Sequence, residues 1–303
     1  MSTISSRLQE TGKHLQTTRL QLRSIFVGID FSRSAHAGLR VAMALARQFG
    51  SKLILGHALP PLLAPVEAPL DPSMLEASAD SARQKLHSIG KELESEGIRH
   101  EEVLAESAAP AFLCEMAKQH DADLIVVGSH GAKGIEKLAL GSVAEGILRR
   151  SHIPVMIVGP KCETGKVSAN YRSVLLATDL GIGSLRAAQY AAAIAEETNS
   201  KLTLLHVGSE ARDISAAARG EVQERLKHLV PDDADQWCRP NLRVEVGDPA
   251  AQILNSALAE EADLIVLGTR GAGPLSDHAP WSTVSKVIRG AACPVLAVPA
   301  HSA

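Results

Sequence analysis

The sequence predicts an α/β protein with two tandem domains, each built on a doubly wound parallel sheet. Short segments rich in Val, Ile and Leu alternate with longer amphipathic segments, as in strands joined by crossover helices. The chain also repeats itself: Ser24–Asp30 is similar to Ser173–Asp179, and Ala122–Gly128 is similar to Ala262–Gly268. A repeat of this length indicates two copies of a domain rather than a solenoid unit. Aromatic residues make up only 3% of the chain, so the core must be aliphatic, as parallel sheets favour.

Five strands and four helices are expected in the first copy, in strict alternation. Each strand is a short apolar run bounded by polar residues or glycine, and each helix shows apolar residues on one face. The expected strands are Ile25–Ile29, Leu53–His57, Arg99–Leu104, Leu124–Val127 and Val155–Val158. The expected helices are Ala35–Phe49, Met74–Glu96, Ala111–Gln119 and Val143–Arg150. The second copy follows the same order with a shorter middle.

Length and composition indicate a globular protein with two domains of ordinary size. We expect an N-terminal extension at 1–23, a first domain at 24–160, a linker at 161–171 and a second domain at 172–300. The net charge of −3, with both signs interspersed, gives no basic face for nucleic acid. No apolar run is long enough to span a membrane, and residues 1–23 lack the apolar core of a signal peptide. The four cysteines have no metal-binding spacing, so a cytoplasmic protein with reduced thiols is expected.

The stretch with the clearest chemistry runs from Asp123 to Ala144. A buried apolar run leads into Gly128 and Gly131, and after nine more residues Gly141 and the following serine open a helical pattern. Glycine lets the backbone come close to a phosphate, and the first turn of a helix offers N–H groups and a positive dipole end. Glycines alone would fit an ordinary β-to-α loop equally well, so the interpretation depends on their spacing.

That spacing, Gly128-x-x-Gly131, nine residues, then Gly141-Ser142, resembles the nucleotide-binding signature of the universal stress protein family, in its ATP-binding branch. The resemblance implies five strands in the order 3-2-1-4-5, with ligands at the carboxyl ends of strands one and four. It also implies an adenine beside Asp30 and Ala58, with Val127 next to the base. The residues implied to hold the ribose and phosphates are Gly128, Gly131, Gly141, Ser142 and Val143.

Several of these residues keep a second interpretation. Asp30 follows a buried strand and precedes a helix, so it could instead serve as a helix cap. His57 and His206 end equivalent strands, and each fits either a base-contacting, pH-sensing role or a hydrogen bond to nearby backbone. The Pro-rich segment Leu59–Asp71 could form a lid over the crevice, a partner-binding segment or a rigid connection to the next helix.

The resemblance implies a stress-response regulatory protein that binds ATP and acts on an unknown protein partner. We expect binding rather than catalysis, because no adenylate-forming phosphate motif, catalytic base or arginine finger is evident. Any Mg²⁺ would be held mostly by the phosphates, since no carboxylate cluster is visible. Two alternatives stay open: a scaffold or sensor that binds another small metabolite, and a slow ATP hydrolase.

The two copies are not expected to be equivalent. The second copy keeps Asp179, Gly268 and Gly271, but Trp281 replaces the glycine before Ser282. A tryptophan at that position would fill the space of a phosphate, so ATP is expected mainly in the first copy, unless the indole turns outward. The family resemblance also implies pairing of the last strands, here Val155–Val158 with Val295–Val298 inside one chain, and a further homodimer is compatible with it.

Overall fold

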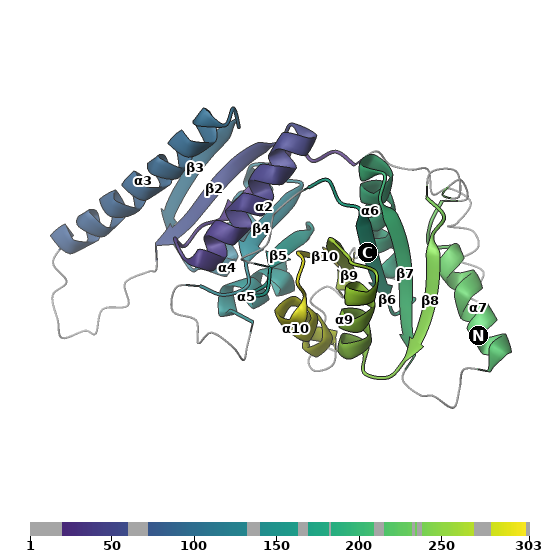
Figure 1. Ribbon diagram of the computed structural model, residues 1–303. Helices are drawn as coiled ribbons and strands as arrows, with labels where there is room; N and C mark the ends of the chain where they lie inside the picture. Colours follow the sequence, from purple (N-terminus) through teal and green to yellow (C-terminus); the bar gives the residue numbers. More distant parts are fainter. Residues whose placement is uncertain are drawn as a thin grey trace, which may run out of the picture. The chain divides into compact units, whose positions relative to one another are not determined.

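The computed structural model consists of two compact units, Gln21–Ala169 and a second that includes Asn170–Ala303 (Figure 1). The residues that the structure describes are 20–59, 72–131, 140–162, 169–181, 183–208, 215–231, 234, 238–269 and 280–300. The predicted N-terminal extension up to residue 19, most of the Pro-rich segment, the loop 132–139 and Gly271 lie outside the described residues.

Each unit has a five-stranded parallel sheet, and the predicted strand order is confirmed in both. In the first unit the order is β3-β2-β1-β4-β5, and in the second it is β10-β9-β6-β7-β8, which is the same order with the opposite edge named first. The first sheet consists of β1 Ser24–Gly28, β2 Lys52–Leu59, β3 His100–Glu106, β4 Leu124–Gly128 and β5 Val155–Val158. The second consists of β6 Ser173–Thr178, β7 Lys201–Gly208, β8 Asn241–Val246, β9 Leu264–Thr269 and β10 Val295–Pro299.

Helices cover both faces of each sheet, as right-handed crossovers require. In the first unit α2 packs on β1 and β4 and α3 on β2 and β3, whereas α4 and α5 contact each other on the other face. The first unit carries α2 Arg33–Phe49, α3 Pro72–Ser95, α4 Ala109–Gln119 and α5 Ser142–Arg150. The second carries α6 Ser184–Thr198, α7 Ala216–Lys227, α9 Pro249–Ala259 and α10 Pro280–Gly290.

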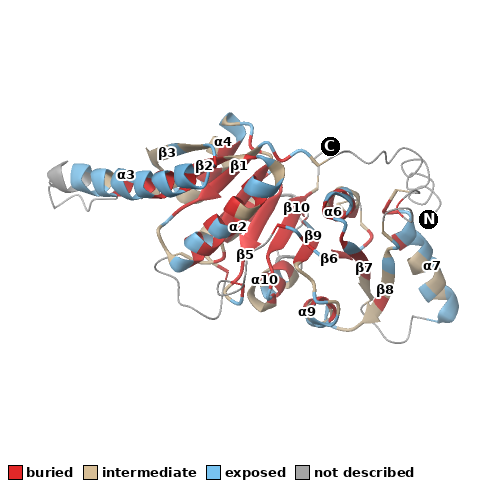
Figure 2. Cartoon of the chain, turned by 45° about the horizontal axis from the view of Figure 1, so that its top comes forward, coloured by how far each residue is buried: buried red, intermediate tan, exposed pale blue. Residues whose placement is uncertain are grey.

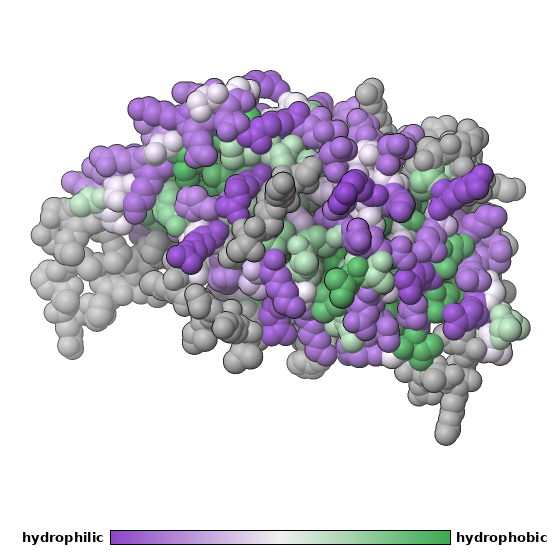
Figure 3. Space-filling model, in the orientation of Figure 1, coloured by the Kyte–Doolittle hydropathy of each residue, from purple (hydrophilic) through white to green (hydrophobic). Residues whose placement is uncertain are grey.

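Local sequence explains where these helices begin and end. The Ser32 side chain accepts a hydrogen bond from the Ala35 N–H, at 3.1 Å, and so caps the N-terminus of α2. Gly50 ends α2 with a φ of 68°, a conformation that glycine adopts without strain. In α3 the buried residues recur at helical spacing, and its outward side in Figure 3 is hydrophilic. The buried residues of α3 include Ala82, Leu86, Ile89 and Leu93.

The core of each unit is an aliphatic sheet sealed on both faces, as Figure 2 shows by the buried strands. In the first unit the aromatic Phe26 lies in the central strand β1 and is fully buried. Its ring fills the space left by Gly56 on the neighbouring strand β2, because a Cβ atom at that glycine would overlap the ring.

We predict that Gly56→Ala lowers the free energy of unfolding of the first unit by about 1–3 kcal/mol, the usual cost of overpacking a core. Denaturant unfolding followed by circular dichroism measures this change. Gly220→Ala is the control, since Gly220 lies inside α7 and a Cβ atom added there would have no heavy atom within 4 Å. Alanine there should leave stability unchanged or raise it by about 1 kcal/mol. Equal stabilities for the parent and Gly56→Ala would contradict the packing.

Candidate functional site

The predicted ligand-binding residues gather at the carboxyl edge of the first sheet. Strands β1 and β4 pair in parallel, with Val27 opposite Val126. Asp30, which follows β1, and Gly128, which ends β4, therefore lie at the same edge, as predicted. The second unit repeats this arrangement, because Ala177 lies opposite Leu267 and places Asp179 and Gly268 at one edge.

Asp30 presents an exposed carboxylate at this edge. Its Oδ1 accepts a hydrogen bond from the Ser32 N–H at 3.0 Å, while Ser32 itself caps α2, so Asp30 orders the turn without being the helix cap. A Cβ atom at Gly131 would lie 2.6 Å from Asp30 Oδ2, which shows that the carboxylate reaches across to the glycine loop. In the second copy Asp179 Oδ1 accepts from both the Gly181 N–H and the Ser184 hydroxyl.

Two of the motif glycines are required by the fold itself. A side chain at Gly128 would overlap Ser34, because the first turn of α2 packs directly on the end of β4. A Cβ atom at Gly141 would lie 3.0 Å from both His130 Cα and the Ser129 carbonyl oxygen. The Gly141 N–H also donates to that same oxygen, at 2.8 Å. The spacing of these glycines thus keeps two backbone segments in contact, a role that the sequence interpretation missed.

The N-terminus of α5 opens onto the same edge with backbone donors that the helix itself does not use. Gly141 is its N-cap residue and makes no side-chain capping bond, and Ser142 is exposed at the first helical position. The helical hydrogen bonds begin with the Glu145 N–H, which donates to the Gly141 carbonyl. The N–H groups of the first turn therefore have no intrahelical acceptor, and they lie at the positive end of the helix dipole.

The corresponding helix of the second unit begins differently. α10 starts at Pro280, so Ser282 is its third residue, whereas Ser142 is the first residue of α5. Ser282 is exposed, and the side chain of Trp281 and residue Gly271 lie outside what the structure describes. Relative to the equivalent serine, the start of this helix is thus shifted by two residues between the copies, in addition to the sequence difference.

The residues predicted to contact the base and the neighbouring groups of the ligand differ in their solvent exposure. Ala58 lies half-buried near the carboxyl end of β2, paired with Ala105 of β3. Val127 is 4% exposed, so its side chain belongs to the core and only its backbone is near the edge. Val143 is half-buried in the first turn of α5.

An aromatic pair that the sequence interpretation did not single out lies beside Asp30. Phe31 has a φ of 61°, and its ring centroid is 4.7 Å from that of His57. Lys85 of α3 places its Nζ 5.3 Å from the Phe31 ring centroid. Leu180 takes the equivalent place in the second unit, with a φ of 59°. The left-handed turn is therefore common to both copies, and the aromatic ring is specific to the first.

The two strand-end histidines are bonded to backbone, which confirms the simpler of their two interpretations. His57 Nδ1 lies 2.6 Å from the Ile29 carbonyl oxygen, and His206 Nδ1 lies 2.9 Å from the Thr178 carbonyl oxygen. A carbonyl oxygen only accepts, so Nδ1 carries the proton in each ring. Each imidazole thus ties the end of the second strand of its unit to the end of the first.

Comparison with known proteins agrees with this geometry. A family model described as the universal stress protein family matches residues 21–159 and again 170–299. The chain belongs to the universal stress protein family. Two units with the same strand order account for the two matches.

Curated relatives and a solved structure share the tandem arrangement. Universal stress protein Rv2623 of Mycobacterium tuberculosis is 31% identical over 290 residues, which cover 90% of this chain and 95% of that protein. A universal stress protein of Mycolicibacterium smegmatis is 26% identical over 90% of this chain and 96% of its own length. The crystal structure of a universal stress protein from Archaeoglobus fulgidus has a TM-score of 0.74 at 23% identity. It covers 93% of this chain and 100% of that chain, and it supports the fold alone.

Other chemistry is limited in the described parts of this universal stress protein. Within those ranges no group of three or more His, Cys, Asp or Glu side chains could hold a metal ion. No helix there is long and apolar enough to cross a bilayer. Burial raises the pKa of the Cys114 thiol to about 11, although the Arg150 charge acts in the opposite direction. A thiol with this pKa stays protonated at neutral pH and is a poor nucleophile.

We predict that Cys114 reacts with iodoacetamide at pH 8 about 100-fold more slowly than an unperturbed thiol, because the thiolate fraction falls tenfold per pKa unit. Its reactivity should rise steadily with pH toward 11. Peptide mass spectrometry of the alkylated protein gives the rate at this site, with the same protein in denaturant as the control. Rapid alkylation of Cys114 in the folded protein at pH 8 would contradict the burial.

Proposed function

We propose that the first unit binds ATP at the carboxyl edge of its sheet, and that the protein is a nucleotide-binding regulator rather than an enzyme. One observation carries the proposal: the exposed Asp30 carboxylate, the Gly131 loop and the uncapped first turn of α5 share this edge. An adenine nucleotide needs an acceptor for its exocyclic amine and donors for its phosphates. Membership of the universal stress protein family supports the same function.

Each residue has a distinct role in this proposal. Asp30 accepts from the exocyclic amine of the base, and Ala58 lines the base without excluding it. The Ser142 hydroxyl and the N–H groups of Ser142 and Val143 donate to phosphate oxygens. Gly131 keeps the space between the Asp30 carboxylate and the ligand open. Mg²⁺, when present, is coordinated mainly by the phosphates and water.

Binding rather than turnover is proposed because the described residues of this edge offer recognition groups without an activated nucleophile. The imidazole of His57 is occupied with the Ile29 carbonyl, which fixes its tautomer and orientation. Bound ATP then acts by favouring one conformation of the protein for a regulatory partner, which requires a difference in ATP affinity between two states. None of the four cysteines, all of them in described parts of the chain, forms a disulfide, in agreement with a proposed cytoplasmic location.

Gly131→Val is the sharpest test of the site. The new side chain would meet the Asp30 carboxylate, a flexible group, whereas Gly141→Trp would push against the backbone of residues 129 and 130. We expect Gly131→Val to weaken Mg-ATP binding by about tenfold or more, with little loss of stability, in titration calorimetry of the full chain. Gly271→Val, the equivalent change in the second copy, is the matched control and should bind like the parent. ATP affinity unchanged by Gly131→Val would refute this site.

The difference between the copies predicts a stoichiometry of one. The Asp179 carboxylate already accepts two hydrogen bonds. Relative to the equivalent serines Ser142 and Ser282, α10 begins two residues earlier than α5. We therefore expect calorimetry of the intact protein to give about one ATP per chain, bound in the first unit. Two equal ATP sites per chain would show that the second unit binds ATP as well. The same samples, assayed for ADP over several hours, report any hydrolysis, and steady release would favour the slow-hydrolase alternative.

A further inference from the structure

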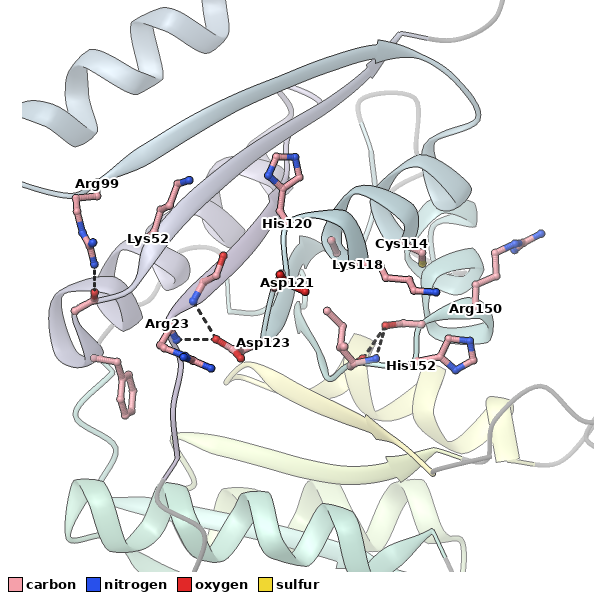
Figure 4. A pocket seen from close by; sticks show the side chains of 17 residues that line it. Arg23, Lys52, Arg99, Cys114, Lys118, His120, Asp121, Asp123, Arg150 and His152 are labelled. Atoms are coloured by element: carbon pink, nitrogen blue, oxygen red, sulfur yellow. Dashed lines mark hydrogen bonds between the residues drawn. The ribbon is translucent and has the colours of Figure 1, made fainter. Parts of the chain in front are cut away.

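A second pocket of the first unit lies at the opposite, amino-terminal edge of the sheet. Its volume is about 1080 Å³, and every residue that lines it belongs to this unit. It is formed where β1 and β2 begin and where α2, α4 and α5 end, and Figure 4 shows it from close by. The residues proposed to bind ATP lie at the other end of the strands, so this pocket is separate from that site.

The lining of this pocket carries an excess of positive charge. Five lysine and arginine residues and two histidines line it, against two aspartates. One aspartate, Asp123, is already bound by the Arg23 and Ser24 N–H groups, at 2.7 and 3.0 Å. Lys52 is paired with Glu101 at 2.6 Å. The lysine and arginine residues are Arg23, Lys52, Arg99, Lys118 and Arg150.

Among the described residues, no paired carboxylate balances the charges of the other four cations. In the described part of the chain, Arg23, Arg99, Lys118 and Arg150 form no ion pair. Arg99 donates to the Gly50 carbonyl at 3.0 Å and Arg150 to the Gly146 carbonyl at 3.2 Å, and such bonds do not neutralise a guanidinium. Figure 4 shows them in two groups: Arg23 and Arg99 at one side of the pocket, Lys118 and Arg150 at the other.

Basic residues at this edge have a second explanation, because helix C-termini favour cations. The second copy tests it, since the same helix ends occur there. The positions equivalent to Lys118 and Arg150 hold Leu258 and Gly290, and Ala292 replaces His152. The fold therefore forms the ends of α4 and α5 without Lys118 and Arg150, so these two cations need another reason, whereas Arg23 keeps a basic counterpart in Arg172.

We propose that this pocket binds a small polyanion with phosphate groups at both ends. Two separated cationic groups match two separated negative groups, and arginine binds phosphate through paired N–H donors. The pocket is in the size range of small-molecule sites. The first unit would then bind two different ligands, one at each edge of its sheet.

Inorganic tripolyphosphate is the probe, titrated by calorimetry into the full chain. The test variant carries Lys118→Leu, Arg150→Gly and His152→Ala, which are the residues of the second copy and are compatible with the same fold. We expect this variant to bind tripolyphosphate at least about tenfold more weakly than the parent. The titration is repeated in the Gly131→Val chain, in which the ATP site is disabled, and the pocket variant should weaken tripolyphosphate binding by a similar factor there, which separates the pocket from the ATP site.

A charge-matched control removes the same charges elsewhere in the first unit. Arg83→Ala, His87→Ala and Lys91→Leu change exposed residues of α3 and should leave binding intact. Lys118→Gln with Arg150→Gln serves as a milder variant if circular dichroism shows that the first one misfolds. Tripolyphosphate binding that survives in a folded pocket variant, or that falls equally in the control, would overturn the proposal.

Discussion

The contact between the end of β4 and the first turn of α2 sets the geometry of the carboxyl edge. Gly128 has no room for a side chain because Ser34 lies against it, and Gly38 of α2 in turn lies against the Val127 backbone. This contact brings the turn after β1, with Asp30, beside the loop after β4. The return of that loop to Gly141, bonded to the Ser129 carbonyl, then places the start of α5 at the same edge. The proposed base acceptor and the proposed phosphate donors come together as a result of backbone packing.

The same packing explains what the sequence could and could not reveal. Alternation of apolar runs and amphipathic segments was enough to place each strand and helix of the first copy within about two residues, because burial alone decides those patterns. The strand order is not contained in such patterns, and it came from the family resemblance. The second role of Gly128 and Gly141 was missed, because it depends on segments brought together only by the tertiary fold. The left-handed turn at Phe31 left no recognisable signal either, since large apolar residues rarely adopt it.

The two copies share an aliphatic type of core, and they differ at both edges of the sheet. Buried positions keep apolar residues and the strand-end histidine keeps its backbone bond, so the fold is equally well specified in each. At the carboxyl edge of the second copy the Ser184 hydroxyl donates to Asp179, and α10 starts two residues before the position equivalent to the start of α5. At the amino edge it replaces Lys118 with Leu258 and Arg150 with Gly290. The differences at the two edges support the proposal that the first unit binds the ligands, because residues at the edges of a sheet contact ligands more often than core residues do.

The central claim is that ATP contacts the backbone of the glycine loop and the first turn of α5. Amide hydrogen exchange with and without Mg-ATP tests it most directly, because the phosphates would engage specific N–H groups. We expect slower exchange at residues 128–131 and 141–144 when Mg-ATP is bound, with residues 281–284 of the second unit unchanged. Unchanged exchange at 141–144 under saturating ATP, or protection confined to 281–284, would contradict it.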